Sequence, residues 1–125
     1  MTRVLLDTHV FMWWVEASSR VKSEWIDMIV DPANEVLVSA VTGFEMETKR
    51  EIGKLEFRYD VSTKIREFEF RPLAISLEHA VLAGSLEWEH RDPFDRMLVG
   101  QAVIEGLTVV SADAIMKSAP GVRVL

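Results

Sequence analysis

Short apolar runs, each followed by a helix pattern, constrain the fold of this chain more than any other feature. Residues 4–6 are apolar without alternation, which is typical of a strand buried on both faces. Further strands are expected over residues 35–38, 71–75, 107–110 and 122–125. Because helix patterns separate these runs, the sequence predicts an α/β fold with three α/β/α layers and a central, mostly parallel sheet of four to five strands.

Helix patterns with recognisable start signals fill the segments between the predicted strands. Thr8, Ser19, Ser39, Ser76 and Asp92 stand where a side chain can cap the first turn of a helix. The expected helices cover residues 9–15, 20–30, 40–52, 61–68, 77–86 and 93–105. No internal repeat, linker or low-complexity segment interrupts this order, so residues 1–125 are expected to form one domain.

One acid, Asp95, falls on a helix face that the pattern assigns to the core. It stands three, four and seven positions before Leu98, Val99 and Ala102, so it shares their face. A carboxylate on an inward face costs several kcal/mol unless something pairs with it. Asp95 therefore indicates a polar cleft, unless it only favours the positive end of the helix dipole.

A second acid, Glu45, belongs to the helix expected over residues 40–52. It also lies on a face that is expected to pack inward. The predicted inward stripe of that helix consists of Val41, Phe44, Thr48 and Ile52, and Glu45 falls within it. The alternative is an ordinary pair between Glu45 and Lys49, four residues further on.

Two more acids, Asp7 and Asp113, lie just past the carboxyl ends of predicted strands. These ends meet at one edge of a parallel sheet, where ligands bind, so four carboxylates would converge there. Their repulsion requires protons or cations, and oxygen ligands without His or Cys favour Mg²⁺ or Mn²⁺ over zinc. Such ions activate water and stabilise a phosphoryl transition state, so phosphodiester hydrolysis is the expected reaction. Taken singly, Asp7 and Asp113 can instead be helix caps.

The composition limits the cellular compartments and the binding partners that are expected for this chain. Hydrophobic residues make up 49% and charged residues 27%, as in soluble globular proteins. Cysteine is absent, which excludes thiolate metal sites and fits a reducing cytoplasm. We expect no signal peptide and no membrane span, since the apolar run over residues 10–15 is too short. The net charge of −6 argues mildly against a bare nucleic-acid-binding surface, but bound divalent cations would cancel part of it.

Four motifs follow one another along nearly the whole chain. They are Leu5-Leu6-Asp7-Thr8-His9, Ser39-Ala40-Val41-Thr42-Gly43-Phe44-Glu45, the segment from His90 to Gln101, and Val110-Ser111-Ala112-Asp113. In this order the motifs resemble those of the PIN-domain ribonucleases, specifically the VapC-type toxins of toxin–antitoxin pairs. The resemblance implies that the chain is an endoribonuclease whose metal-binding acids are Asp7, Glu45, Asp95 and Asp113. The departures are Gly43-Phe44, where the family usually has a larger residue and Trp, and Gly100, where Ala is usual. Gly100 carries a helix cost of about 1 kcal/mol.

Several polar residues beside these acids have two interpretations. Thr8 and Ser111 can hold a carboxylate or a metal-bound water in place, or they can simply cap helices. Asp92 is expected to be a cap rather than a metal ligand. His9 and His90 are expected to be packing or surface residues, because a metal-activated water needs no histidine base.

Partners are suggested by basic and aromatic residues and by the resemblance. Basic side chains near the acids can guide an RNA backbone or form a solvated face. They are Lys49, Arg50, Lys54, Arg58, Arg91 and Arg96. Phe11, Trp13 and Trp14 cannot all be buried by one helix face, which suggests a partner groove or a dimer contact. The resemblance implies an RNA substrate, a homodimer and a cognate antitoxin, which would present a basic side chain such as Arg to the acids.

Two functions other than a nuclease are also compatible with parts of this pattern. A phosphoryl-accepting receiver domain also binds Mg²⁺ at a sheet edge, but it needs an Asp after a central strand. The third predicted strand ends at Ile75-Ser76 without one, and Lys117 is misplaced for the required lysine. A catalytically silent PIN-fold binding module is the second alternative, and metal-dependent cleavage of an RNA panel would separate it from the enzyme.

Overall fold

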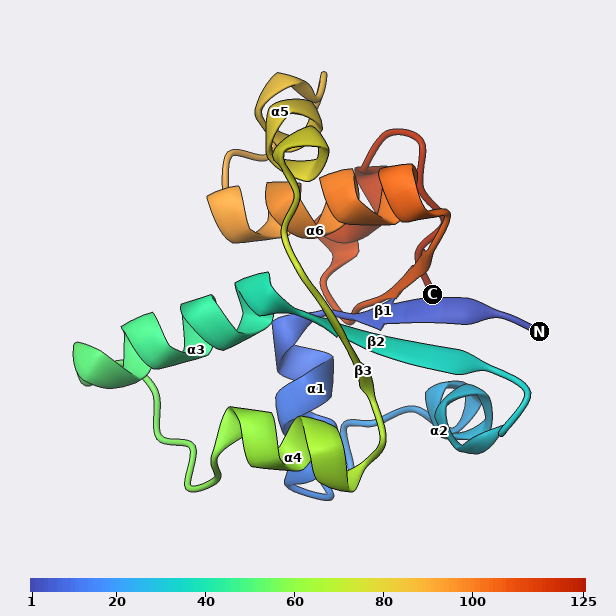
Figure 1. Ribbon diagram of the computed structural model, residues 1–125, viewed down its shortest axis with the longest axis vertical. Coiled ribbons are helices and arrows are strands. Elements are labelled where there is room, and N and C mark those ends of the chain that lie inside the picture. The colour runs from blue at the N-terminus through green and yellow to red at the C-terminus, as the bar shows by residue number, and fades with distance from the viewer.

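Four parallel strands form the central sheet of the computed structural model, which describes all 125 residues (Figure 1). The strands are β1 (Arg3–Leu6), β2 (Glu35–Ser39), β3 (Arg71–Leu73) and β4 (Thr108–Val110). Their order across the sheet is β3-β2-β1-β4, so the first strand of the chain lies between β2 and β4. The predicted final strand is reduced to one parallel bridge between Val109 and Val124. The sheet therefore has four strands, within the predicted range.

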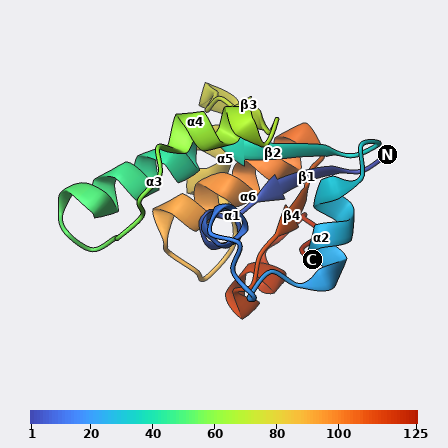
Figure 2. The same ribbon diagram turned by 90° about the horizontal axis from the view of Figure 1, so that it is seen from below.

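Helices cover both faces of the sheet, which confirms the predicted three-layer α/β/α fold (Figures 1 and 2). On one face lie α1 (Thr8–Val15), α2 (Ser23–Val30) and α4 (Val61–Glu67), and on the other α5 (Leu77–Ser85) and α6 (Pro93–Glu105). At the carboxyl edge, α3 (Ala40–Glu51) extends beyond the sheet, and the 3₁₀ turn η1 (Ala114–Ser118) follows β4. None of the helices combines the length and apolar character that crossing a membrane requires.

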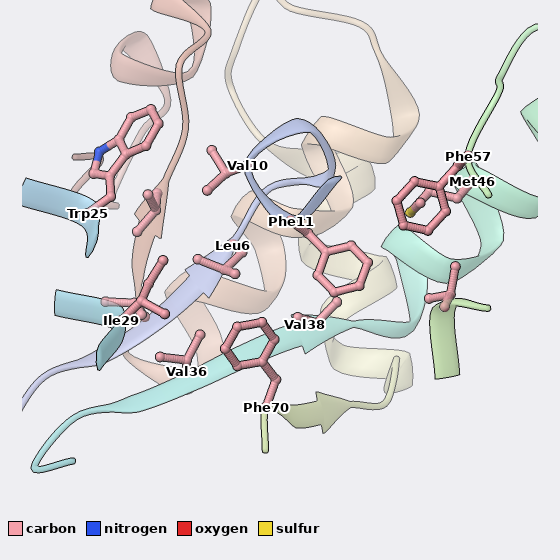
Figure 3. Packing of buried hydrophobic residues seen from close by; sticks show 13 residues of the cluster. Leu6, Val10, Phe11, Trp25, Ile29, Val36, Val38, Met46, Phe57 and Phe70 are labelled. Carbon is pink, nitrogen blue, oxygen red and sulfur yellow. The ribbon is translucent and has the colours of Figure 1, made fainter. Parts of the chain in front are cut away.

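The alternation of side chains along β1 divides the core into two clusters. Leu6 packs with Phe11 of α1 and Trp25 of α2 on one face, as Figure 3 shows. Leu5 points to the opposite face, where it packs with Leu98 of α6. Because successive side chains of a strand point to opposite faces, a strand buried on both sides must be apolar throughout. This explains the unbroken apolar run that begins the chain.

Two helix starts differ from the sequence prediction. The helix after β1 begins at Thr8 rather than after it, because Oδ1 of Asp7 accepts the backbone N–H of Val10 at 2.9 Å. Asp7 is therefore the cap that was assigned to Thr8. The second helix begins after Lys22, whose side chain makes no capping bond, so the cap predicted at Ser19 is wrong. The predicted caps that the structure confirms are Ser39, Ser76 and Asp92.

The predicted inward stripe of α3 is wrong for most of its length. The buried residues of this helix are Val41, Thr42, Glu45 and Met46. Phe44 and Ile52 are 63% and 60% exposed. The physical reason for the exposure of Phe44 is that the packed face of α3 runs through Val41, Thr42, Glu45 and Met46, so that Phe44 lies beside this face and not within it. The C-terminal half of α3 is exposed because the helix runs past the edge of the sheet (Figure 1). A periodic apolar pattern shows which residues share a helix face but not where the neighbouring elements end.

Candidate active site

Asp7 lies directly after β1 and is almost fully buried. Its Oδ1 caps α1 by accepting the N–H of Val10, and the hydroxyl of Ser111 near the carboxylate acts to lower its pKa. Burial nevertheless raises the pKa of Asp7 above its ordinary value, and the negative charge of Asp95 raises it further. An acid in this state holds an incompletely compensated charge, which a cation would stabilise.

Glu45 lies in the second turn of α3 and is also buried, as the sequence predicts. Its Oε1 accepts a hydrogen bond from Oγ1 of Thr8 at 2.7 Å, and that hydroxyl lies 3.2 Å from Oγ1 of Thr42. Its other oxygen, Oε2, pairs with Nζ of Lys49. Glu45 therefore faces inward, as its helix position predicts, and also forms the alternative i,i+4 ion pair with Lys49.

Asp95 lies in the first turn of α6, with its side chain 25% exposed. Its Oδ2 is 2.6 Å from Nε2 of His90, and its backbone N–H is capped by Asp92 at 2.9 Å. Burial raises the pKa of Asp95 above its ordinary value, and the charges of Asp92 and Glu45 add to this effect. The hydrogen bond from His90 opposes it.

Asp113 lies three residues past β4 and is exposed, unlike the other three acids. Its Oδ1 accepts the N–H of Ile115 at 3.2 Å, so it caps the 3₁₀ turn. Its own N–H donates to the hydroxyl of Ser111 at 3.1 Å. Asp113 and Asp7 line the same surface pocket of about 320 Å³.

The four acids are thus linked in pairs around the carboxyl edge of the sheet. Asp7 interacts electrostatically with Asp95, and Asp95 with Glu45, while Asp113 shares a pocket with Asp7. No three His, Asp or Glu side chains surround a common point as a finished metal cage. Each carboxylate is instead held by its own neighbour.

The chemistry of these donors fits a hard divalent cation. Asp7 and Asp95 supply only oxygen atoms, and both carry raised pKa values because nearby negative charge and burial are incompletely offset. Oxygen donors of this kind suit Mg²⁺ or Mn²⁺ rather than zinc. One basic side chain, that of Lys49, lies beside these acids, and its ion pair is with Glu45.

Arg96 is not available to RNA, contrary to the prediction that grouped it with the surface cations. It is 7% exposed, and its guanidinium donates to backbone carbonyl oxygens at the end of α5 and in the loop between α5 and α6. The acceptors are the carbonyls of Ala83, Gly84, Leu86, Trp88 and His90. The sequence pattern could not distinguish Arg96 from the exposed Arg91, because the carbonyls that bind Arg96 come from a separate segment of the chain.

Phe11 is also misassigned as part of a partner groove. Its side chain is fully buried in the core between α1 and the sheet (Figure 3). Trp13 and Trp14 remain partly exposed. Trp13 lines the pocket that contains Asp7 and Asp113, and Trp14 lines an apolar groove with Phe68. As predicted, α1 does not bury all three rings, and Phe11 is the one that is fully buried.

His90 is the residue at this site whose contact the sequence reasoning missed. It was expected to be a packing or surface residue, yet it hydrogen-bonds Asp95 and packs its ring edge-on against Trp88. His90 lies in a loop and Asp95 in a helix five residues later, and no periodic sequence pattern indicates a contact between two such residues. The contact depends on how the loop folds back onto α6.

The sequence as a whole identifies the class of protein. Residues 4–122 match the family model of the PIN domain, and the chain belongs to the PIN-domain family. It is similar to Ribonuclease VapC22 of Mycobacterium tuberculosis, with 26% identity over 121 residues. That match covers 94% of this chain and 92% of the relative.

Solved structures of the same fold include two VapBC complexes bound to DNA. VapBC2 from Rickettsia felis, bound to a DNA fragment from its promoter, has a TM-score of 0.73 at 14% identity, covering 99% of this chain and 98% of that one. DNA-bound VapBC from Salmonella typhimurium has a TM-score of 0.68 at 17% identity, covering 100% and 98%. At these identities the similarity establishes a shared fold.

Proposed function

We propose that this chain is a VapC-type endoribonuclease that hydrolyses RNA phosphodiester bonds with Mg²⁺ or Mn²⁺. The observation that carries the proposal is the pair of neighbouring acids Asp7 and Asp95, both with raised pKa values, at the carboxyl edge of a PIN-domain sheet. When bound there, a divalent ion supplies an activated water and offsets the charge of the phosphoryl transition state. The similarity to Ribonuclease VapC22 supports RNA as the substrate.

The residues of this chain have separate parts in the proposed reaction. Asp7, Glu45, Asp95 and Asp113 would hold the metal ion. Thr8 orients the carboxylate of Glu45 through a hydrogen bond, and Ser111 does the same for Asp7. Asp92 fixes the start of α6, which sets the position of Asp95. The exposed side chains of Lys54 and Arg91 would attract the RNA backbone, as would the partly exposed Lys49 and Arg50.

Cleavage of single-stranded RNA in the presence of Mn²⁺ tests this proposal. Asp7→Asn keeps an oxygen that can accept the N–H of Val10 but removes the charge. We expect cleavage to fall about 100-fold or more, and EDTA to abolish the wild-type activity. Asp27→Asn removes an exposed acid of α2 and serves as the charge-matched control. Equal cleavage by Asp7→Asn and wild type would remove Asp7 from the site. If the wild type bound RNA without cutting it, the silent binding module would be favoured.

A protein partner forms part of the same proposal. The structural relatives are VapBC complexes, which supports an antitoxin as the partner of this chain. An apolar groove of about 390 Å³ between α1, α2 and α4 is lined by Trp14, Val21, Ile26 and Phe68. It fits the apolar face of a partner helix. An arginine of the same partner would pair with the acids through its two-pronged guanidinium and exclude the metal.

Two further features of the proposal rest on the family resemblance and on composition. A homodimer is inferred from the resemblance to VapC-type proteins. A cytoplasmic location fits a chain without cysteine, which needs no oxidising compartment for its stability. The solution mass of the purified protein tests the first, and fractionation of cells that express it tests the second.

A further inference from the structure

Two phenylalanines meet at the surface beside the acidic site. Phe44 of α3 is 63% exposed although the helix pattern predicted it to be buried. Its ring centroid lies 6.0 Å from that of Phe94, and the ring planes are inclined by 57°. Phe94 is only partly buried. Most of the Phe44 ring is therefore open to contact with a ligand, and the Phe94 ring beside it is partly open as well.

The position of the two rings relates them directly to the proposed chemistry. Phe44 immediately precedes Glu45, and Phe94 immediately precedes Asp95. The helices that carry them, α3 and α6, pack against each other. The ring pair is therefore fixed at the margin of the acid group by the same two helices that hold Glu45 and Asp95.

A positive charge lies at the junction between the rings and the acids. Nζ of Lys49 pairs with Glu45 and lies 6.0 Å from the centroid of the Phe94 ring. Lys49 is 39% exposed, so it can also reach a ligand outside the protein. The surface next to the acids therefore combines exposed aromatic faces with one ammonium group, rather than forming a broad apolar patch.

We propose that the exposed ring of Phe44, supported by the inclined ring of Phe94, is a stacking platform for one unpaired nucleobase of an RNA strand, with Lys49 beside the phosphate of that strand. Every nucleobase presents a π-face, and stacking on aromatic side chains is the general way in which proteins hold single strands. A duplex cannot use this platform unless a base leaves the stack. The inference rests on the proposed nuclease function and specifies its substrate as single-stranded or looped RNA.

Kinetics with Phe44 variants test stacking against simple apolar contact. Phe44→Leu keeps apolar bulk without a π-face, whereas Phe44→Tyr keeps the π-face. For a single-stranded RNA oligonucleotide we expect KM to rise about tenfold in the Leu variant and to stay near the wild-type value in the Tyr variant. Ile52→Ala is the control, because Ile52 is 60% exposed and directly follows the far end of the same helix. Equal KM values for Phe44→Leu and wild type would overturn the platform.

An abasic scan of the RNA locates the stacked base. Removing one base near the cleaved bond should raise KM for the wild type by a similar factor. The same removal should have little effect in Phe44→Leu, since the contact has already been lost. Additive losses from the two changes would show that no base stacks on Phe44.

A binding measurement separates the platform from the catalytic proposal. In an Asp7→Asn background, Phe44→Trp introduces an indole whose fluorescence a stacked base should quench when the same RNA is added. Ile52→Trp in that background should show no additional quenching. Quenching without cleavage by the wild type would refute only the nuclease. Cleavage without quenching would refute only the platform, as would a loss of oligomer mass in Phe44→Leu with unchanged RNA affinity, because Phe44 would then contact a second copy of the chain.

Discussion

Nε2 of His90 lies 2.6 Å from Oδ2 of Asp95, and the loop that carries His90 is held by the next residue of α6. Arg96 donates to the carbonyl oxygens of both Trp88 and His90, at 2.9 and 3.0 Å. The Trp88 ring in turn packs edge-on against His90. One helix therefore supplies both a proposed metal-binding acid and the side chain that fixes the partner of that acid.

The first prediction concerns the imidazole of His90. His90→Ala removes the group that orients the Asp95 carboxylate, so the Mn²⁺ concentration for half-maximal cleavage should rise about 10- to 100-fold. His90→Gln retains a side-chain N–H donor and should recover most of that loss. Titration calorimetry with Mn²⁺ provides a readout that does not depend on catalysis. An unchanged Mn²⁺ requirement in the Ala variant would show that Asp95 does not need this contact.

The second prediction concerns stability and the guanidinium of Arg96. Arg96→Met leaves several buried carbonyl oxygens without a donor, and each orphaned acceptor carries a penalty of about 1–3 kcal/mol. The free energy of unfolding in urea should fall by about 3 kcal/mol or more. Arg91→Met, which changes an exposed neighbour, should alter it by no more than about 0.5 kcal/mol. Similar losses in the two variants would show that the loop does not depend on Arg96.

The third prediction is a pH dependence that follows from the raised pKa of Asp7. At neutral pH the folded, metal-free protein carries an ionised carboxylate whose burial disfavours charge, so Asp7 lowers stability there. As the pH falls through the raised pKa toward the ordinary value of 3.8, the folded protein takes up the proton before the unfolded chain does, and this loss disappears. Asp7→Asn should therefore have the higher Tm at pH 7, and the difference should shrink as the pH approaches 4.

Divalent ions should reverse the order of the two Tm values, so that the wild type becomes the more stable protein. Mn²⁺ binding requires the ionised carboxylate, so it should raise the Tm of the wild type at pH 7 and have a smaller effect at pH 4, where more of Asp7 is protonated. Asp7→Asn should respond weakly at both pH values. Thermal unfolding of both proteins, with and without Mn²⁺, provides the measurement. A wild-type Tm that responds equally to Mn²⁺ in both buffers would contradict the assignment of Asp7 as a ligand.

The fourth prediction compares two glycines within helices. A Cβ on Gly100 would lie 2.9 Å from the carbonyl oxygen of His79 and 3.1 Å from Cβ of Ala83, because α5 and α6 approach closely there. Gly100→Ala should therefore destabilise the protein by about 1–3 kcal/mol despite the better helix propensity of alanine. At Gly43 nothing lies within 4 Å, so Gly43→Ala should stabilise it by about 0.5–1 kcal/mol. Urea unfolding of the two variants tests both signs.

The same glycine shows where sequence reasoning reached its limit. From the sequence, Gly100 is expected only to lower the helix propensity of α6. In the structure it allows α5 to approach α6 closely, which depends on the path of α5. Four strands, most helices and the inward-facing position of Glu45 could be predicted, because periodicity and strand ends are local signals. The exposure of Phe44 and the burial of Arg96 could not be predicted. Both depend on how separate segments pack against the helix that carries the residue, and no local pattern encodes that.

The last prediction concerns the apolar groove and the partner helix proposed for it. Trp14 lines the groove, and its ring lies 6.2 Å from that of Phe68. Trp14→Ala should weaken binding of the antitoxin while the acids stay intact. The loss of a large, partly buried ring can also destabilise the fold, so a milder change is needed beside it.

Ile26→Asp supplies that milder change, because Ile26 lies in the same groove and is 40% exposed. A charge in the groove should weaken antitoxin binding at least tenfold, because an apolar helix would have to bury it. Leu77→Asp alters an 80% exposed residue of α5, on the opposite face of the sheet, and serves as the control. Affinity and solution mass are measured together. If Trp14→Ala and Ile26→Asp dissociate a dimer while the monomer binds the antitoxin normally, the groove is a contact between copies of this chain, and its assignment to the antitoxin is wrong.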